Sequence, residues 1–383
     1  MTPLFEDWSI CPGGPSTFPQ PVWLMRFAIA ICRQTTECIT VMPDLRAYRG
    51  EITRSFNRLT TTWLLVCLLA FASGSGANEA YAGFKAPPLP IESEPTLPRK
   101  GVTVHGFELA YVEAGQGDPI LFLHGVPTSS YLWRNVMPHL EGQGRVIAMD
   151  LLGFGQSAAQ ESAMTFEEHY ELVAGFIAAL GLERLTLVMH DWGSALGLHY
   201  ARLHPNKVRA IATMEAIVAP TMPADSYDAL QPGSAAFFRR VRAPVSGPRE
   251  IIEENYFIES ALPQAVVRPL TEQIHNHYRM PFRTSESRKF LASWPAMMPI
   301  GGVPTDTKAV VSAYNQWLEQ TDIPWLFLYA RPGTLNPPST ADYWVGKAKN
   351  IEVTYIGAGR HFVQEDQPYA IGRALADWYR RSR

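Results

Sequence analysis

Short apolar runs alternate with amphipathic stretches through most of the chain after residue 100. Such runs predict buried parallel strands over residues 119–123, 145–149, 185–189, 208–214, 325–329 and 351–356. Two further short strands, over 102–104 and 108–113, would pair around Gly106. Helical spacing covers residues 166–180 and 368–379. Strands that alternate with helices predict an α/β fold, with a mostly parallel sheet flanked by helices.

Residues 216–318 interrupt this alternation. The segment is rich in proline and aromatic residues and has no clear strand pattern; its aromatic residues include Phe237, Phe238, Tyr256, Phe257, Tyr278, Phe282 and Trp294. It follows the sixth predicted strand, and the strand pattern resumes after it. We therefore expect a helical cap inserted into one α/β domain that covers residues 101–383.

The most informative stretch is residues 185–199, LTLVMHDWGSALGLH. An apolar strand is followed almost at once by a helical pattern, which leaves only residues 190–194 to turn the chain. This strand–turn–helix pattern predicts a nucleophile elbow with Asp191 at the turn. A lone Asp before a helix is usually an N-cap. At an elbow, however, its carboxylate is ionised at neutral pH and can attack carbon to form an ester without help from a base.

Two further polar residues follow strands of the same predicted sheet. Glu215 directly follows an apolar strand, and His361 lies in the glycine-containing loop after the last strand. The crevice of an open parallel sheet lies outside the carboxyl ends of its strands. We therefore expect Asp191, Glu215 and His361 to meet there as nucleophile, orienting acid and base. The segment after the strand 325–329, Ala-Arg-Pro-Gly, offers no carboxylate, which favours Glu215 as the acid.

A secretory signal is predicted near the N-terminus. Arg54 and Arg58 precede an apolar run over residues 59–73, and an A-x-A cleavage site follows at residues 80–82. The apolar run is too short to cross a bilayer comfortably, so no stable membrane anchor is expected, and a permanent anchor is the second alternative. With a signal peptide, we expect the protein to be exported to the periplasm or the medium. The alternative is a cytoplasmic enzyme that carries a hydrophobic extension.

The position of this signal bears on the organisation of the chain. A signal peptide belongs at the extreme N-terminus, so we interpret residues 42–82 as the signal and residues 1–41 as a mis-annotated extension before a true start at Met42. Residues 83–100 are rich in proline and predict an extended linker.

Composition narrows the classes of function. The formal net charge is -3 and 18% of residues are charged, so no basic surface argues for nucleic-acid binding. The four cysteines all precede the predicted domain, which therefore has no thiol chemistry, disulfide or cysteine-based metal site; they are Cys11, Cys32, Cys38 and Cys67. A hydrophobic content of 46% and ten tryptophans are typical of a compact enzyme core.

Several segments resemble those of a known enzyme family. HGVPTSSYLWRNVMPHL at 124–140, HDWGSALG at 190–197, MEAI at 214–217 and GRHFVQEDQP at 359–368 are similar to the haloalkane dehalogenases of the α/β-hydrolase fold. The resemblance runs across residues 101–380, cap included. Epoxide hydrolases share HDWG, whereas PTSSYLWR together with HDWGSALG is specific to the dehalogenases.

The resemblance implies a role for each candidate residue. Asp191 would displace halide from carbon and form an alkyl ester, and His361, oriented by Glu215, would activate the water that hydrolyses it. The backbone N–H groups of Val126 and Trp192 would hold the oxyanion, and the Trp192 indole would bind the halide. The substrate is a small halogenated molecule, water is the co-substrate, and no metal or organic cofactor is implied.

Val126 departs from the family pattern. Relatives with an acid at the Glu215 position normally carry Asn after the His-Gly of this loop, and its amide is the second halide donor. Valine keeps the backbone N–H but has no side-chain donor. Tyr256, Tyr278 and Trp294 of the cap are candidates to replace it.

Two other hypotheses for the function stay open. One is a different α/β-hydrolase reaction, either epoxide opening, which would use two cap tyrosines, or a luciferase-like oxidation on the same scaffold. A fluoroacetate dehalogenase is disfavoured, because that family has Arg where Trp192 stands. The other is an exported protein that binds a ligand on this scaffold without catalysis, motivated by Val126. The sequence predicts neither the substrate range nor the oligomeric state.

Overall fold

A computed structural model describes residues 90–160 and 162–382 of the chain. The proposed extension (residues 1–41), the signal peptide (42–82) and residues 83–89 of the linker lie outside the described residues, so these assignments stay predictions. Within the described part, no helix combines the length and the apolarity needed to cross a bilayer.

An eight-stranded sheet forms the centre of the fold, in the order β1-β2-β4-β3-β5-β6-β7-β8. The strands are β1 Arg99–Val104, β2 Phe107–Ala114, β3 Pro119–Leu123, β4 Arg145–Met149, β5 Leu185–Asp191, β6 Val208–Ala216, β7 Trp325–Pro332 and β8 Ile351–Gly359. β2 pairs antiparallel with β1 and β4, and the other pairs are parallel. The predicted α/β-hydrolase fold is confirmed.

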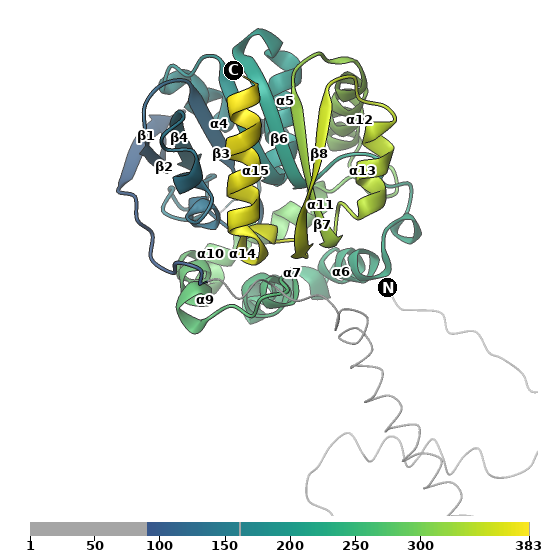
Figure 1. Ribbon diagram of the computed structural model, residues 1–383. Helices are drawn as coiled ribbons and strands as arrows, with labels where there is room; N and C mark the ends of the chain where they lie inside the picture. Colours follow the sequence, from purple (N-terminus) through teal and green to yellow (C-terminus); the bar gives the residue numbers. More distant parts are fainter. Residues whose placement is uncertain (1–89, 161, 383) are drawn as a thin grey trace, which may run out of the picture. The chain divides into compact units, whose positions relative to one another are not determined.

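Helices cover both faces of this sheet. They are α4 Phe166–Ala179, α5 Trp192–Leu203, α12 Thr305–Gln320, α13 Pro338–Val345, α14 Val363–Asp366 and α15 Pro368–Arg381. Figure 1 shows α15 in front of the sheet, with α5 and α12 behind it.

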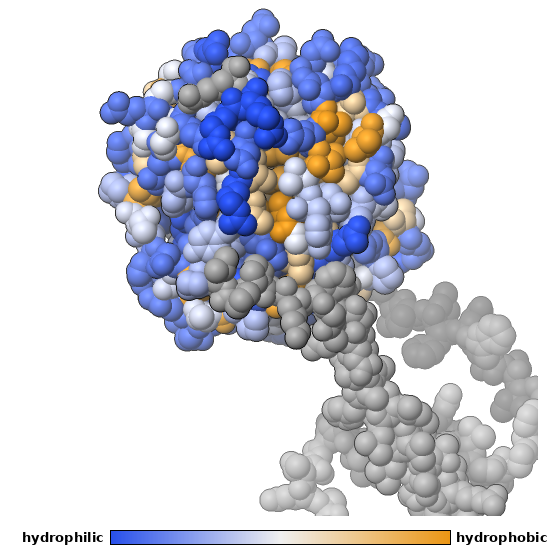
Figure 2. Space-filling view, viewed as in Figure 1, coloured by the Kyte–Doolittle hydropathy of each residue, from blue (hydrophilic) through white to orange (hydrophobic). Residues whose placement is uncertain are grey.

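On the face viewed in Figure 2 hydrophilic side chains predominate, and hydrophobic ones gather beside α15 in the region of β8. β8 is the outer strand of the sheet, so residues such as Ile351 and Val353 are only half-buried.

The cap lies at the end of the sheet towards which the parallel strands point (Figure 1). All named elements between β6 and α12 are helical: η4 Tyr227–Ala229, α6 Pro232–Val241, α7 Ser246–Glu254, η5 Phe257–Ala261, α8 Leu262–Gln264, α9 Glu272–Arg279, η6 Met280–Phe282, α10 Ser285–Lys289, η7 Phe290–Ser293 and α11 Trp294–Met297. The next helix, α12, packs against α5 of the main domain. The cap therefore covers the sheet edge at which the candidate residues were expected.

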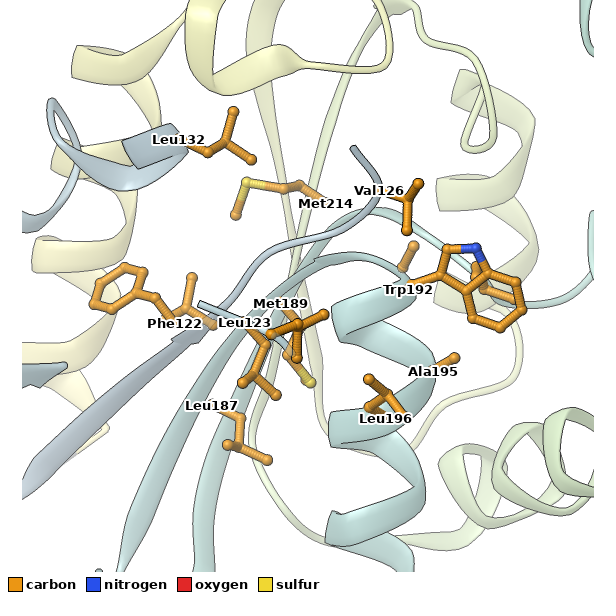
Figure 3. Packing of buried hydrophobic residues seen from close by; sticks show 14 of the residues in the cluster. Phe122, Leu123, Val126, Leu132, Leu187, Met189, Trp192, Ala195, Leu196 and Met214 are labelled. Atoms are coloured by element: carbon orange, nitrogen blue, oxygen red, sulfur yellow. The ribbon is translucent and has the colours of Figure 1, made fainter. Parts of the chain in front are cut away.

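The core is continuous from the sheet into the first turns of α5. Figure 3 shows Leu123 of β3 and Met189 of β5 side by side next to α5. Gly197 allows this close approach, because a Cβ there would lie 2.4 Å from the sulfur of Met189. The start of α5 is thereby packed closely against the end of β5.

Candidate active site

Asp191 ends β5 and turns the chain into α5. Its φ is +47° and its side chain is buried. Positive φ is strained for a residue with a side chain and persists only where the surroundings hold it. Two glycines make room: a Cβ on Gly125 would lie 2.3 Å from Asp191 Oδ2, and one on Gly193 would lie 2.4 Å from the carbonyl oxygen of Leu123. The elbow predicted from the sequence is present.

The two oxygens of the Asp191 carboxylate have different surroundings. Oδ2 accepts the Val126 N–H at 2.9 Å, and the Trp192 N–H also bonds to the carboxylate. Oδ1 faces His361, with Nε2 at 3.7 Å. Burial raises the pKa of Asp191, although the charge of His361 and these two N–H groups favour its ionised form. One oxygen is thus held by backbone donors, and the other is directed towards the imidazole.

His361 lies between the two carboxylates. Nδ1 is 3.2 Å from Glu215 Oε2, and because a carboxylate only accepts, Nδ1 donates and Nε2 keeps its lone pair on the Asp191 side. Burial lowers the pKa of His361, but the hydrogen bond with Glu215 and the charges of Asp191 and Glu215 outweigh it. The net result is a pKa raised above its ordinary value of 6.5.

Glu215 is held by the loop that follows β7. Its carboxylate accepts the backbone N–H groups of Thr334, Leu335 and Asn336, at 2.7 to 3.3 Å. Gly333 has a φ of +68°, and a Cβ there would lie 2.6 Å from the carbonyl oxygen of Asn336. The loop therefore supplies donors to an acid that comes from the neighbouring strand β6. The sequence does not predict this arrangement, because backbone N–H donors are present in every residue except proline and leave no pattern.

Two more side chains that the sequence did not single out support the site. The Ser194 hydroxyl donates to the carbonyl oxygen of Asp191 at 2.5 Å and accepts the Ile217 N–H at 2.9 Å. His190 Nε2 donates to the carbonyl oxygen of His361 at 2.9 Å, and burial places the pKa of His190 well below its ordinary value. A neutral His190 therefore fixes the backbone of the predicted base. Its place directly before Asp191 is the only sequence signal that could have indicated this.

The Trp192 indole and the Val126 side chain lie beside each other (Figure 3). The indole is buried, and Trp294 of the cap stands edge-on to it, with ring centroids 5.4 Å apart. Valine therefore presents methyl groups on this side of the elbow, where an amide would present N–H donors.

The three cap residues considered as substitute donors differ in their partners. The Tyr278 hydroxyl donates to Glu365 at 2.5 Å, and the Tyr256 ring stacks under Arg240. Trp294 Nε1 is buried with no hydrogen-bond partner among the described residues, but it has no accessible surface. The Tyr278 hydroxyl is thus bonded to Glu365, and Trp294 Nε1 is not accessible; neither offers a free donor to a halide beside Trp192.

Comparisons with known proteins agree with the geometry. A family model described as alpha/beta hydrolase fold matches residues 118–368. The chain is 40% identical over 299 residues to a haloalkane dehalogenase of Sphingobium indicum, covering 76% of this chain and 99% of that protein. It is 37% identical over 295 residues to a haloalkane dehalogenase of Mesorhizobium japonicum, covering 76% of this chain and 94% of the relative.

Solved structures give the same result. The crystal structure of haloalkane dehalogenase DbeA from Bradyrhizobium elkani matches with a TM-score of 0.72 and 36% identity, covering 75% of this chain and 98% of that one. The crystal structure of DatA from Agrobacterium tumefaciens C58 matches with a TM-score of 0.71 and 35% identity, covering 77% of this chain and 100% of that one.

Proposed function

Since the chain belongs to the haloalkane dehalogenases, hydrolases that act on carbon–halide bonds, we propose that it converts haloalkanes to alcohols through a covalent ester on Asp191. One observation carries the proposal. Asp191 Oδ2 accepts backbone N–H groups at the elbow, while Oδ1 faces an imidazole that is itself bonded to Glu215.

The first step is displacement at carbon. Asp191 Oδ1 attacks the halogen-bearing carbon, a carbon–oxygen bond forms, and the halide leaves with the electron pair of its bond. The Trp192 indole N–H stabilises the departing anion. The product of this step is an alkyl ester of Asp191 and a bound halide ion.

The second step is hydrolysis of the ester. His361 Nε2 takes a proton from water, and the resulting hydroxide attacks the ester carbonyl carbon. The negative charge develops on Oδ2, which the N–H groups of Val126 and Trp192 already contact. Collapse releases the alcohol and restores the carboxylate, and His361 returns its proton to solvent.

A substrate panel tests the proposal. The purified protein is expected to release bromide from short bromoalkanes above the buffer blank. Epoxide turnover without bromide release would favour the epoxide reading, and the absence of either would favour a binding protein. The epoxide reading is weakened by Tyr278, since its hydroxyl already donates to Glu365.

Val126→Asn is expected to speed the first step, and so to raise kcat/KM for bromide release. One hydrogen bond to a charged leaving group is worth roughly 1.5 to 3 kcal/mol, which corresponds to about ten- to 150-fold in rate. Val126→Leu is the matched control, because the leucine side chain resembles that of asparagine in shape but has no amide. Both variants keep the backbone N–H of residue 126. An unchanged or lower rate in Val126→Asn would show that the halide is held in another way.

The turnover rate is expected to fall as the pH decreases. Hydrolysis needs a neutral Nε2 on His361, whose pKa is raised above 6.5, and attack needs an ionised Asp191, whose pKa is raised by burial. Both conditions fail as the pH decreases, so kcat should lose about tenfold per pH unit below the pKa of His361. The measurement is kcat for a bromoalkane between pH 5 and 9; a flat profile down to pH 5 would rule out this assignment of the base.

A further inference from the structure

Asn336 makes contacts on two sides of the predicted acid. The residue is fully buried in the loop after β7. Its Oδ1 accepts the Ala216 N–H at 2.5 Å, and its Nδ2 donates to the Ala216 carbonyl oxygen at 2.9 Å. Its own backbone N–H donates to Glu215 Oε1 at 3.3 Å. One residue therefore binds both the carboxylate and the backbone that directly follows it.

Ala216 also adjoins the predicted nucleophile. In the β5–β6 ladder Ala216 pairs with Asp191, and the register shifts between His190 and Asp191, where Glu215 is passed over. The next residue, Ile217, donates its N–H to Ser194 Oγ. The backbone held by the Asn336 amide thus lies between the two carboxylates of the site.

The backbone at this point needs outside support. Glu215 has a φ of +46°, a strained conformation for a residue with a side chain. Strain of this kind persists where the surroundings over-determine the chain. The Asn336 amide offers one acceptor and one donor to Ala216, the same pair of groups that a neighbouring strand would offer. It therefore holds the strand end in the conformation that aims Glu215 at His361.

We propose that Asn336 is a positioning residue, which fixes Glu215 against His361 and thereby sets the rate of ester hydrolysis. This inference rests on the covalent route proposed above. Without the amide, the two buried backbone groups of Ala216 lose their partners, and the contact between Nδ1 and Oε2 loses its support. Attack by Asp191 on the haloalkane does not use His361, so the first step is unaffected.

Asn315 provides a matched control. It is a buried asparagine of α12 whose Oδ1 accepts the Ala219 N–H at 3.1 Å and whose Nδ2 donates to the Met222 carbonyl oxygen at 2.9 Å. The chemistry of the contact is the same as that of Asn336, but no hydrogen bond joins Asn315 to Glu215. Asn→Asp at each position replaces the donor by an acceptor without a change of shape.

The test compares Asn336→Asp and Asn315→Asp in the full protein with a bromoalkane. In Asn336→Asp, kcat should fall at least about tenfold with kcat/KM unchanged, and alkyl-enzyme should accumulate in the steady state when followed by intact-protein mass spectrometry. Asn315→Asp should keep both kinetic parameters within about twofold. Asn336→Ser, which keeps a small polar side chain without the added negative charge, replaces Asn336→Asp if that variant does not fold, and the same fall in kcat is expected.

Three results would overturn the inference. A folded Asn336 variant with unchanged kcat, an equal loss of kcat and kcat/KM, or the same loss in Asn315→Asp would each do so. A wild-type protein that releases no bromide from any reactive bromoalkane would instead overturn the proposed function, and the inference with it.

Discussion

Asp191→Asn is expected to abolish bromide release, lowering kcat/KM by at least about 10⁴-fold, the scale of loss when a nucleophile is removed. The amide keeps an oxygen to accept the N–H groups of Val126 and Trp192 but cannot displace a halide. Because burial raises the pKa of Asp191, the ionised carboxylate is disfavoured in the folded state. The variant should therefore melt at the same temperature as the wild type or higher.

This combination separates chemistry from stability. Bromide release is measured beside thermal melting, with wild-type protein of the same preparation as the reference. Retention of more than about one hundredth of the wild-type rate would exclude Asp191 as the nucleophile, since the loss would then be far below the scale expected for one. A large drop in melting temperature would contradict the argument that the buried charge costs stability.

His361→Phe should stop turnover after one round. The ring keeps the shape of the site but cannot take a proton from water, so the ester is formed and not hydrolysed. Each protein molecule should release about one equivalent of bromide, and steady-state release should fall at least about 10³-fold. The burst and the later rate are measured in the same bromide assay.

The first-step rate is the internal control for this variant. It should match the wild-type alkylation rate, since displacement at carbon does not require the imidazole. A His361→Phe protein that releases no burst would indicate that His361 acts in the first step. One that continues to turn over would indicate that another group activates the water.

The sequence predicted the elements that have an apolar signature. The strand ends were less well predicted: β7 continues to Pro332 and β8 to Gly359, because Arg331 pairs with Ala358 and Pro332 with Gly359 without an apolar pattern. β1 begins at Arg99, where the sequence has no apolar pattern because most of this edge strand is exposed or half-buried. Hydrophobic patterns report burial, whereas ladders extend as far as backbone geometry allows.

The residues of the candidate site also fall into two groups, those that the sequence predicts and those that depend on tertiary packing. Asp191, Glu215 and His361 could be predicted because each follows a recognisable strand, and the structure brings all three together. The three N–H donors to Glu215, and the hydrogen bonds from the Asn336 side chain to Ala216, depend on how the loop after β7 folds against the end of β6. That packing is a tertiary property, and a single sequence does not encode it in any local pattern.

The central claim is a transient covalent bond between Asp191 and substrate carbon. The most direct measurement is peptide mass spectrometry of His361→Phe protein after incubation with a reactive bromoalkane and proteolysis. We expect one modified peptide, which contains Asp191 and is heavier by the mass of the alkyl group less one hydrogen. An alkyl group found only on other peptides, or no modified peptide despite bromide release, would contradict it.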